Sequence, residues 1–108
     1  MRIIEIDKSL IPYRFRVAIE GSTFEFEVFY NLEHDYFTVD LWYQDILVVQ
    51  GEKLVLGKQL FTTFRHLPQP KAVIVPLDLS NRVDRITFDN FGKDVFLYVS
   101  KEGDFDDI

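Results

Sequence analysis

The sequence contains no cysteine, and this absence removes two common ways of holding a small protein together. A chain without thiols forms no disulfides and offers no thiolate ligands to a structural zinc ion. Histidine is also scarce, with two residues in the whole chain. The 108-residue chain must therefore be stabilised by a packed core, and its 47% hydrophobic residues are enough to form one.

Long hydrophobic runs are missing as well. The longest are ILVV and AVIVPL, far shorter than the roughly 20 residues that a membrane-spanning helix needs. The first residues, MRIIEIDK, mix charges with apolar side chains and do not read as a signal peptide. We therefore expect synthesis in the cytoplasm without an export signal, and no membrane partner.

The charge is acidic overall and unevenly distributed. A formal net charge of −6 argues against sequence-independent binding of nucleic acid, which depends on neutralising phosphates. Residues 17–52 contain eight acidic residues and no Lys or Arg, whereas residues 53–77 contain four basic residues and no acid. Either two regions of one fold attract each other, or opposite patches meet between neighbouring subunits.

Motifs for catalysis and cofactor binding are absent from the sequence. It contains no GxSxG, HExxH, P-loop or GxGxxG pattern. His34 beside Asp35 is the one candidate acid–base pair, and neighbouring turn residues rarely point at a common site. The acids at 104, 106 and 107 lack the glycine and distant glutamate of a calcium loop. We therefore predict no enzyme, no catalytic residue, no metal, no cofactor and no small-molecule substrate.

An alternating stretch, YRFRVAIEGSTFEFEVFY at residues 13–30, predicts a β-hairpin around which the fold is organised. Every second residue is apolar in both arms, so the pair has one apolar and one polar face. A two-residue turn at Gly21-Ser22 places glycine at the first central position. This turn predicts a register in which Arg16 lies opposite Glu27.

Short branched or aromatic segments, separated by turn residues, predict the remaining strands. These segments are residues 2–6, 36–43, 46–50, 53–56, 72–75, 85–88 and 94–99. Turns are expected at 44–45, 51–52 and 90–93, and Pro76 is expected to stop the strand before it. The fold class is all-β: one domain over residues 1–101, an antiparallel β-barrel or sandwich of about seven to nine short strands with no substantial helix. Residues 102–108, EGDFDDI, form an acidic tail expected to fray.

Two regions are candidates for binding surfaces. The proline-containing segment 60–71, LFTTFRHLPQPK, is too irregular for a helix or a central strand, and forms either an exposed arm or a loop over one end of the sheet. Trp42 shares a strand face with polar residues. Aromatic residues of so small a barrel more often belong to the core, and the alternatives are a protein–protein contact or a platform for carbohydrate. The candidate interface residues are Trp42, Lys58, Phe61, Phe64, Arg65 and His66.

Five blocks between residues 11 and 99 resemble the small all-β baseplate plug proteins of tailed phages and prophages, typified by a component of a cyanophage contractile-tail baseplate. They are IPYRFRVAIEGSTFEFEVFYN, DYFTVDLWYQD, GEKLVLGKQLF, AVIVPLDLS and RITFDNFGKDVFLYV. The resemblance implies a structural protein of the virion, made in the bacterial host and lodged near the central hub of the baseplate. Its implied partners are other tail proteins and copies of itself. The alternative is a carbohydrate- or receptor-binding β module that uses exposed aromatic residues.

Overall fold

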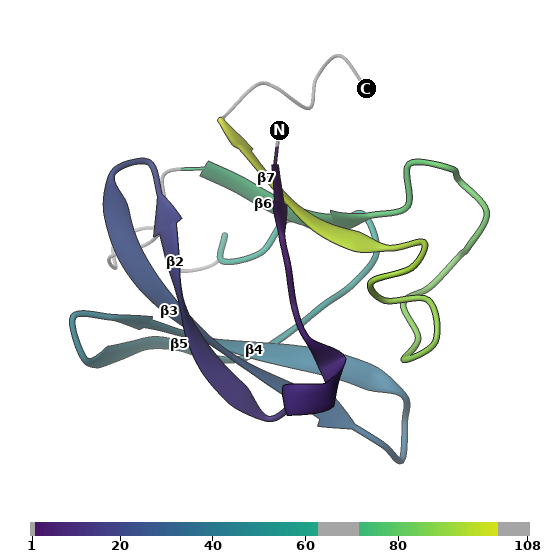
Figure 1. The fold of residues 1–108 in the computed structure, drawn as a ribbon, viewed down its shortest axis with the longest axis horizontal. Coiled ribbons are helices and arrows are strands. Elements are labelled where there is room, and N and C mark those ends of the chain that lie inside the picture. The colour runs from purple at the N-terminus through teal and green to yellow at the C-terminus, as the bar shows by residue number, and fades with distance from the viewer. Residues whose placement is uncertain (1, 63–71, 102–108) are drawn as a thin grey trace.

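A computed structural model describes residues 2–62 and 72–101, which form seven strands and one 3₁₀ turn. The elements are β1 (Arg2–Ile4), η1 (Lys8–Leu10), β2 (Tyr13–Ile19), β3 (Ser22–Asn31), β4 (Tyr36–Tyr43), β5 (Ile46–Lys53), β6 (Ala72–Leu77) and β7 (Phe96–Lys101). One sheet has the order β2-β3-β4-β5 and the other β1-β7-β6, with antiparallel neighbours throughout (Figure 1). The predicted all-β class is confirmed. The two sheets are not closed into one barrel.

The predicted hairpin is present as β2 and β3, with its turn one residue earlier than expected. Glu20 and Gly21 occupy the central turn positions with φ of 49° and 80°. Two positive φ angles define a type I′ turn, whose twist suits a two-residue hairpin. Arg16 therefore pairs with Glu25, and the predicted pairing with Glu27 is wrong. The register is displaced by an even number of residues, so each side chain stays on its predicted face.

Strand β4 has the predicted bounds, and β5 follows it after the predicted turn at Gln44 and Asp45. The expected turn at 51–52 and a separate strand at 53–56 are wrong, because β5 runs on to Lys53. Gly51 has a φ of 71°, and β5 shifts register against β4 at two places. The Gly51 N–H donates to the buried Asp40 carboxylate at 2.7 Å. The positive φ of this glycine therefore belongs to a β-bulge and not to a turn, since one type of bulge places a glycine in the left-handed conformation.

Strand β7 lies in the middle of the second sheet, between β6 and β1. The predicted hairpin between residues 85–88 and 94–99 is wrong, because 85–88 is not a strand and β7 pairs instead with β1 and β6. Local hydrogen bonds hold the intervening segment in an irregular loop. The Asp78 carboxylate accepts N–H bonds from Ser80, Arg82 and Val83 at 2.7–3.0 Å. Strand β1 ends at Ile4, two residues before its predicted end.

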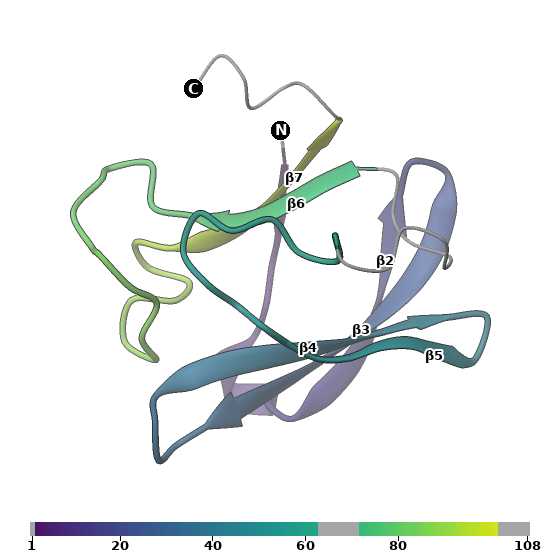
Figure 2. The same ribbon diagram turned by 180° about the vertical axis from the view of Figure 1, so that it is seen from behind.

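The outer edge of β6 is covered by the loop that follows β5 (Figure 2). Gly57 and Leu60 donate their N–H groups to the carbonyls of Pro76 and Ile74, both at 2.8 Å. Pro76 does not stop the strand as predicted, since β6 continues to Leu77. The Pro76 nitrogen faces the covering loop and not β7, so the missing N–H removes no ladder hydrogen bond.

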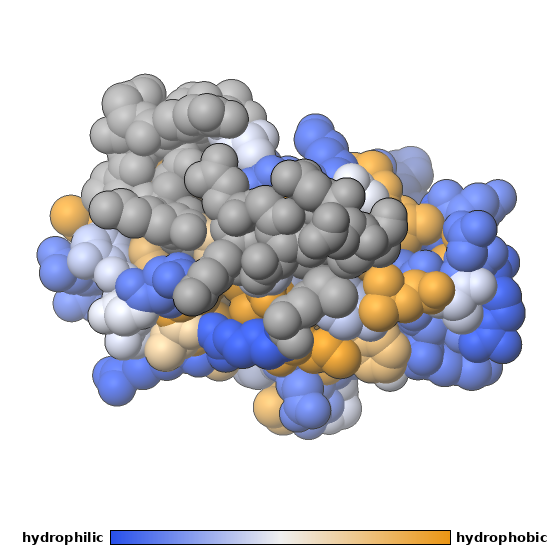
Figure 3. All heavy atoms as spheres, turned by 90° about the horizontal axis from the view of Figure 1, so that it is seen from above, coloured by the Kyte–Doolittle hydropathy of each residue, from blue (hydrophilic) through white to orange (hydrophobic). Residues whose placement is uncertain are grey.

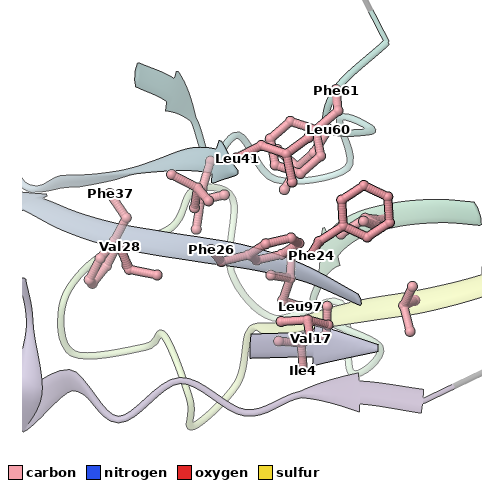
Figure 4. Close-up of a cluster of buried hydrophobic side chains, with 14 of the residues drawn as sticks. Ile4, Val17, Phe24, Phe26, Val28, Phe37, Leu41, Leu60, Phe61 and Leu97 are labelled. Carbon is pink, nitrogen blue, oxygen red and sulfur yellow. The ribbon is translucent and has the colours of Figure 1, made fainter. Parts of the chain in front are cut away.

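One hydrophobic core joins the two sheets (Figure 4). The first sheet contributes the apolar face predicted from the alternating pattern, including the fully buried Phe26 and Leu41. The second sheet contributes Ile74 and Leu97. Burial of each such side chain stabilises the fold by about 1.5–3 kcal/mol. The opposite face of the first sheet is left for polar and interaction residues.

Candidate interaction surface

The predicted interface residues do not form one surface in the structure. Trp42 lies on the outer face of the four-stranded sheet, paired with Glu25 on β3. Phe61 lies on the opposite, inner side, where it is 5% exposed and its ring meets that of Phe26 edge-on at 5.6 Å. Lys58 is exposed in the loop after β5. The predicted residues Phe64, Arg65 and His66 lie outside the described residues.

Trp42 is half-buried, because an arginine covers its ring. The Arg14 guanidinium carbon lies 4.0 Å from the ring centroid, a cation–π contact. Arg14 also forms an ion pair with Glu25, which fixes the guanidinium over the indole. The indole Nε1 is buried and has no hydrogen-bond partner among residues 2–62 and 72–101. A ring covered in this way does not offer the open face that stacking on a sugar requires.

Charged residues of both signs surround this stack. Arg14 pairs with Glu27 across the strands, and Arg16 pairs with Glu25. Leu47 neighbours Trp42 on β5 and is 37% exposed. The outer face of the first sheet therefore combines an arginine-capped aromatic, an apolar neighbour and alternating charges, which is the composition of a protein contact.

Asp35 ties the turn between β3 and β4 to the loop before β7. Its carboxylate accepts hydrogen bonds from the Tyr30 hydroxyl at 2.7 Å, the Phe88 N–H at 2.9 Å and the Arg85 guanidinium at 2.9 Å. The Tyr30 bond, followed by the Phe88 N–H, lowers the pKa of Asp35. The same bond raises the pKa of Tyr30, since it favours the protonated phenol. Asp35 therefore has a structural role, because its hydrogen bonds hold the two segments together.

His34, the other half of the candidate acid–base pair, is directed elsewhere. Its Nε2 lies 3.9 Å from the Glu33 carboxylate, and its ring stacks on Tyr36 at 6.5 Å between centroids. Within residues 2–62 and 72–101, no hydrogen bond joins His34 to Asp35. The same part of the chain holds no cluster of three or more metal-ligating side chains and no helix long and apolar enough to span a membrane.

A cleft of about 400 Å³ lies between the N-terminal segment and the residues around the start of β7. Its lining includes Glu5, Asp7, Tyr13, Phe91, Val95 and Leu97. The sequence analysis did not predict this cleft. The two segments that line it are joined only when β1 pairs with β7, and no local motif signals that pairing.

The surface over the second sheet is mixed in character. Figure 3 shows hydrophilic residues gathered toward both ends of this face and hydrophobic residues between them.

Residues 1–102 match the protein family described as the cyanophage baseplate Pam3 plug gp18. The chain belongs to this family. The match spans almost the whole sequence and confirms the resemblance seen in the five sequence blocks. A search of curated proteins finds no match. Membership in the plug family supports a structural role in a phage baseplate and a location in the virion tail.

Proposed function

We propose that this protein is a structural subunit lodged near the central hub of a phage or prophage baseplate. It acts by binding other tail proteins and further copies of itself, without catalysis, a cofactor or a small-molecule substrate. Residues 1–101 form its one domain and 102–108 an acidic tail. Synthesis takes place in the cytoplasm of the bacterial host.

The observation that carries this proposal is the match to the plug family over residues 1–102. The two sheets around one core supply a stiff body for such a part. The carbohydrate-binding alternative is not favoured, because Arg14 lies over the Trp42 ring that would have to stack on the sugar.

The contacts that we propose for assembly use opposite charges. Lys58 and Arg65 belong to the basic stretch of residues 53–77, and the four-stranded sheet carries the acids of residues 17–52. Lys58 is exposed and has no ionic partner among the described residues. Juxtaposed patches of opposite sign steer association and set register between subunits. Phe64 and His66 flank Arg65 in this contact, with Trp42 as an anchor.

The protein composition of purified particles tests the role. We expect mass spectrometry to detect this chain in purified virions or induced prophage tails. Deletion of its gene should leave particles with incomplete baseplates. Intact, infective particles that lack the chain would refute the proposal.

Substitution of the basic residues tests the contact. We expect Lys58→Glu and Arg65→Ala each to reduce incorporation into particles while leaving the thermal midpoint of the isolated protein unchanged. Lys93→Glu changes an exposed lysine in the loop before β7, outside the basic stretch of residues 53–77, and serves as the matched control. Equal loss of incorporation in all three variants would show that net charge, and not this contact, controls assembly.

A further inference from the structure

The cleft beside β1 has an apolar floor. Phe96, which is half-buried, lines it together with Phe91, Val95 and Leu97, which are 3%, 0% and 0% exposed. They come from the segment that leads into β7 and from β7 itself. The N-terminal segment after β1 runs along the other side on its way to η1 (Figure 1). The cleft is therefore open to solvent at its mouth and hydrophobic at its base.

The mouth of the cleft is acidic. Glu5 and Asp7 line it, and no Lys or Arg does so among the described residues. Glu5 is exposed and forms no ion pair or hydrogen bond with them. The Asp7 Oδ1 accepts bonds from the N–H and hydroxyl of Ser9 at 2.9 and 2.6 Å, which leaves Oδ2 open. The Tyr13 hydroxyl, held at 2.8 Å by the Asp7 N–H, adds a third oxygen.

The nearest cations of the same segment are engaged elsewhere. The Lys8 ammonium donates to the Phe88 carbonyl at 2.5 Å and lies over the Phe88 ring. The Arg2 guanidinium donates to the Ala18 carbonyl. Lys93 is exposed and does not line the cleft. The carboxylates at the mouth are thus left without a cation from the described part of the chain.

We infer that this cleft receives a lysine or arginine side chain from a neighbouring protein. The methylene stem of such a residue would lie on the apolar floor, and its cation would meet the carboxylates of Glu5 and Asp7 at the mouth. Long basic side chains suit a site of this kind, because they are apolar along the stem and charged at the tip. The inference rests on the proposed assembly role for the source of the side chain.

The chemistry of the cleft is tested with small side-chain mimics. The full chain, labelled with ¹⁵N, is titrated with n-butylguanidinium and n-butylammonium, and with n-butanol and butyrate at matched ionic strength. We expect saturable amide shifts at Glu5, Asp7, Gly92 and Val95 with the two cations and weaker or no shifts with the alcohol and the anion. Equal shifts with n-butanol, or shifts spread over the whole surface, would overturn the inference.

A pair of variants separates the cleft from general acidity. Glu5→Gln should weaken binding of n-butylguanidinium by about two- to five-fold, the range for an exposed ion pair. Glu20→Gln removes an exposed acid from the β2–β3 turn and should leave the affinity unchanged. Equal effects of both variants would refute the cleft as the site. The titration requires no other tail protein, so its failure leaves the baseplate role standing, and absence from virions leaves the titration result standing.

Discussion

The two sheets differ in the sequence separation between the strands that pair in them. In β2-β3-β4-β5, every strand pairs with its neighbour in sequence through a short turn. In β1-β7-β6, the pairing of Arg2 with Val99 joins the two ends of the described chain. Closing such a long loop costs more conformational entropy than forming a hairpin. The four-stranded sheet is therefore specified locally, whereas the three-stranded sheet depends on the rest of the fold.

The largest expected effect tests whether the two sheets nevertheless unfold together. Phe26→Ala in the first sheet should destabilise the protein by about 3–5 kcal/mol, and Leu97→Ala in the second by about 2–5 kcal/mol, because both side chains are fully buried. Urea unfolding followed by Trp42 fluorescence and by far-ultraviolet circular dichroism provides the measurement. We expect coincident transitions in both variants. A Leu97→Ala protein whose Trp42 signal unfolds later would show that the first sheet is stable alone.

This contrast accounts for what the sequence could predict. The faces of β2, β3 and β4 follow from alternation, and they were predicted correctly. The register of the hairpin was displaced, because Gly21 suits either a type II′ turn with Ser22 or a type I′ turn with Glu20. At Gly51, a glycine bulge and a hairpin turn can both use a positive φ, so the glycine alone does not distinguish them.

A smaller effect tests the β2–β3 turn. Gly21 has a φ of 80°, so Gly21→Ala should destabilise the protein by about 1–2 kcal/mol through left-handed backbone strain. No atom lies within 4 Å of the position that a Cβ would take, so the loss would not reflect a clash. Thermal unfolding measures the difference. An unchanged midpoint would contradict the type I′ assignment.

The neighbouring turn position predicts a gain. Glu20 adopts a φ of 49°, which a glutamate rarely tolerates. Glu20→Asn should stabilise the protein by about 0.5–1 kcal/mol, since Asn-Gly is the preferred pair in type I′ turns. Comparison of urea midpoints is sufficient. Leu32→Ala, at a residue 83% exposed in the next turn, is the neutral control. A loss of stability in Glu20→Asn would refute the argument.

The smallest effect concerns the irregular loop before β7 and appears only in acid. Hydrogen bonds from Ser80, then from the N–H groups of Arg82 and Val83, lower the pKa of Asp78 from 3.8 to about 2. A carboxyl whose pKa is lowered by folding stabilises the protein above its unfolded pKa, and this contribution is lost as the pH falls through about 2. Stability should therefore decrease from pH 4 to pH 2, and less steeply in Asp78→Asn.

Asp84→Asn removes the same charge from an exposed residue of that loop that accepts no hydrogen bond from the described chain, and it serves as the control. Its unfolding midpoint should keep the acid dependence of the original protein. If both variants flatten the pH profile equally, net charge and not the Asp78 hydrogen bonds is responsible.

The candidate site was harder to predict than the sheet. Alternation correctly separated Trp42 from the core face, but nothing in the sequence indicated that Arg14 would cover its ring. Phe61 was predicted as an interface residue because it lies in the irregular segment 60–71, yet it packs against Phe26. The cleft depends on Glu5 and Phe91 approaching each other, and this approach follows from the long-range pairing of β1 with β7.

The strand edges have a consequence for polymerisation. Strand β1 has three residues, β2 carries Arg14 and Arg16, β5 is bulged, and β6 is covered by the loop at 57–60. Each of these arrangements hinders the addition of a foreign strand. Every sheet edge in the described part of the chain is thus protected against the edge-to-edge pairing from which a fibre would grow.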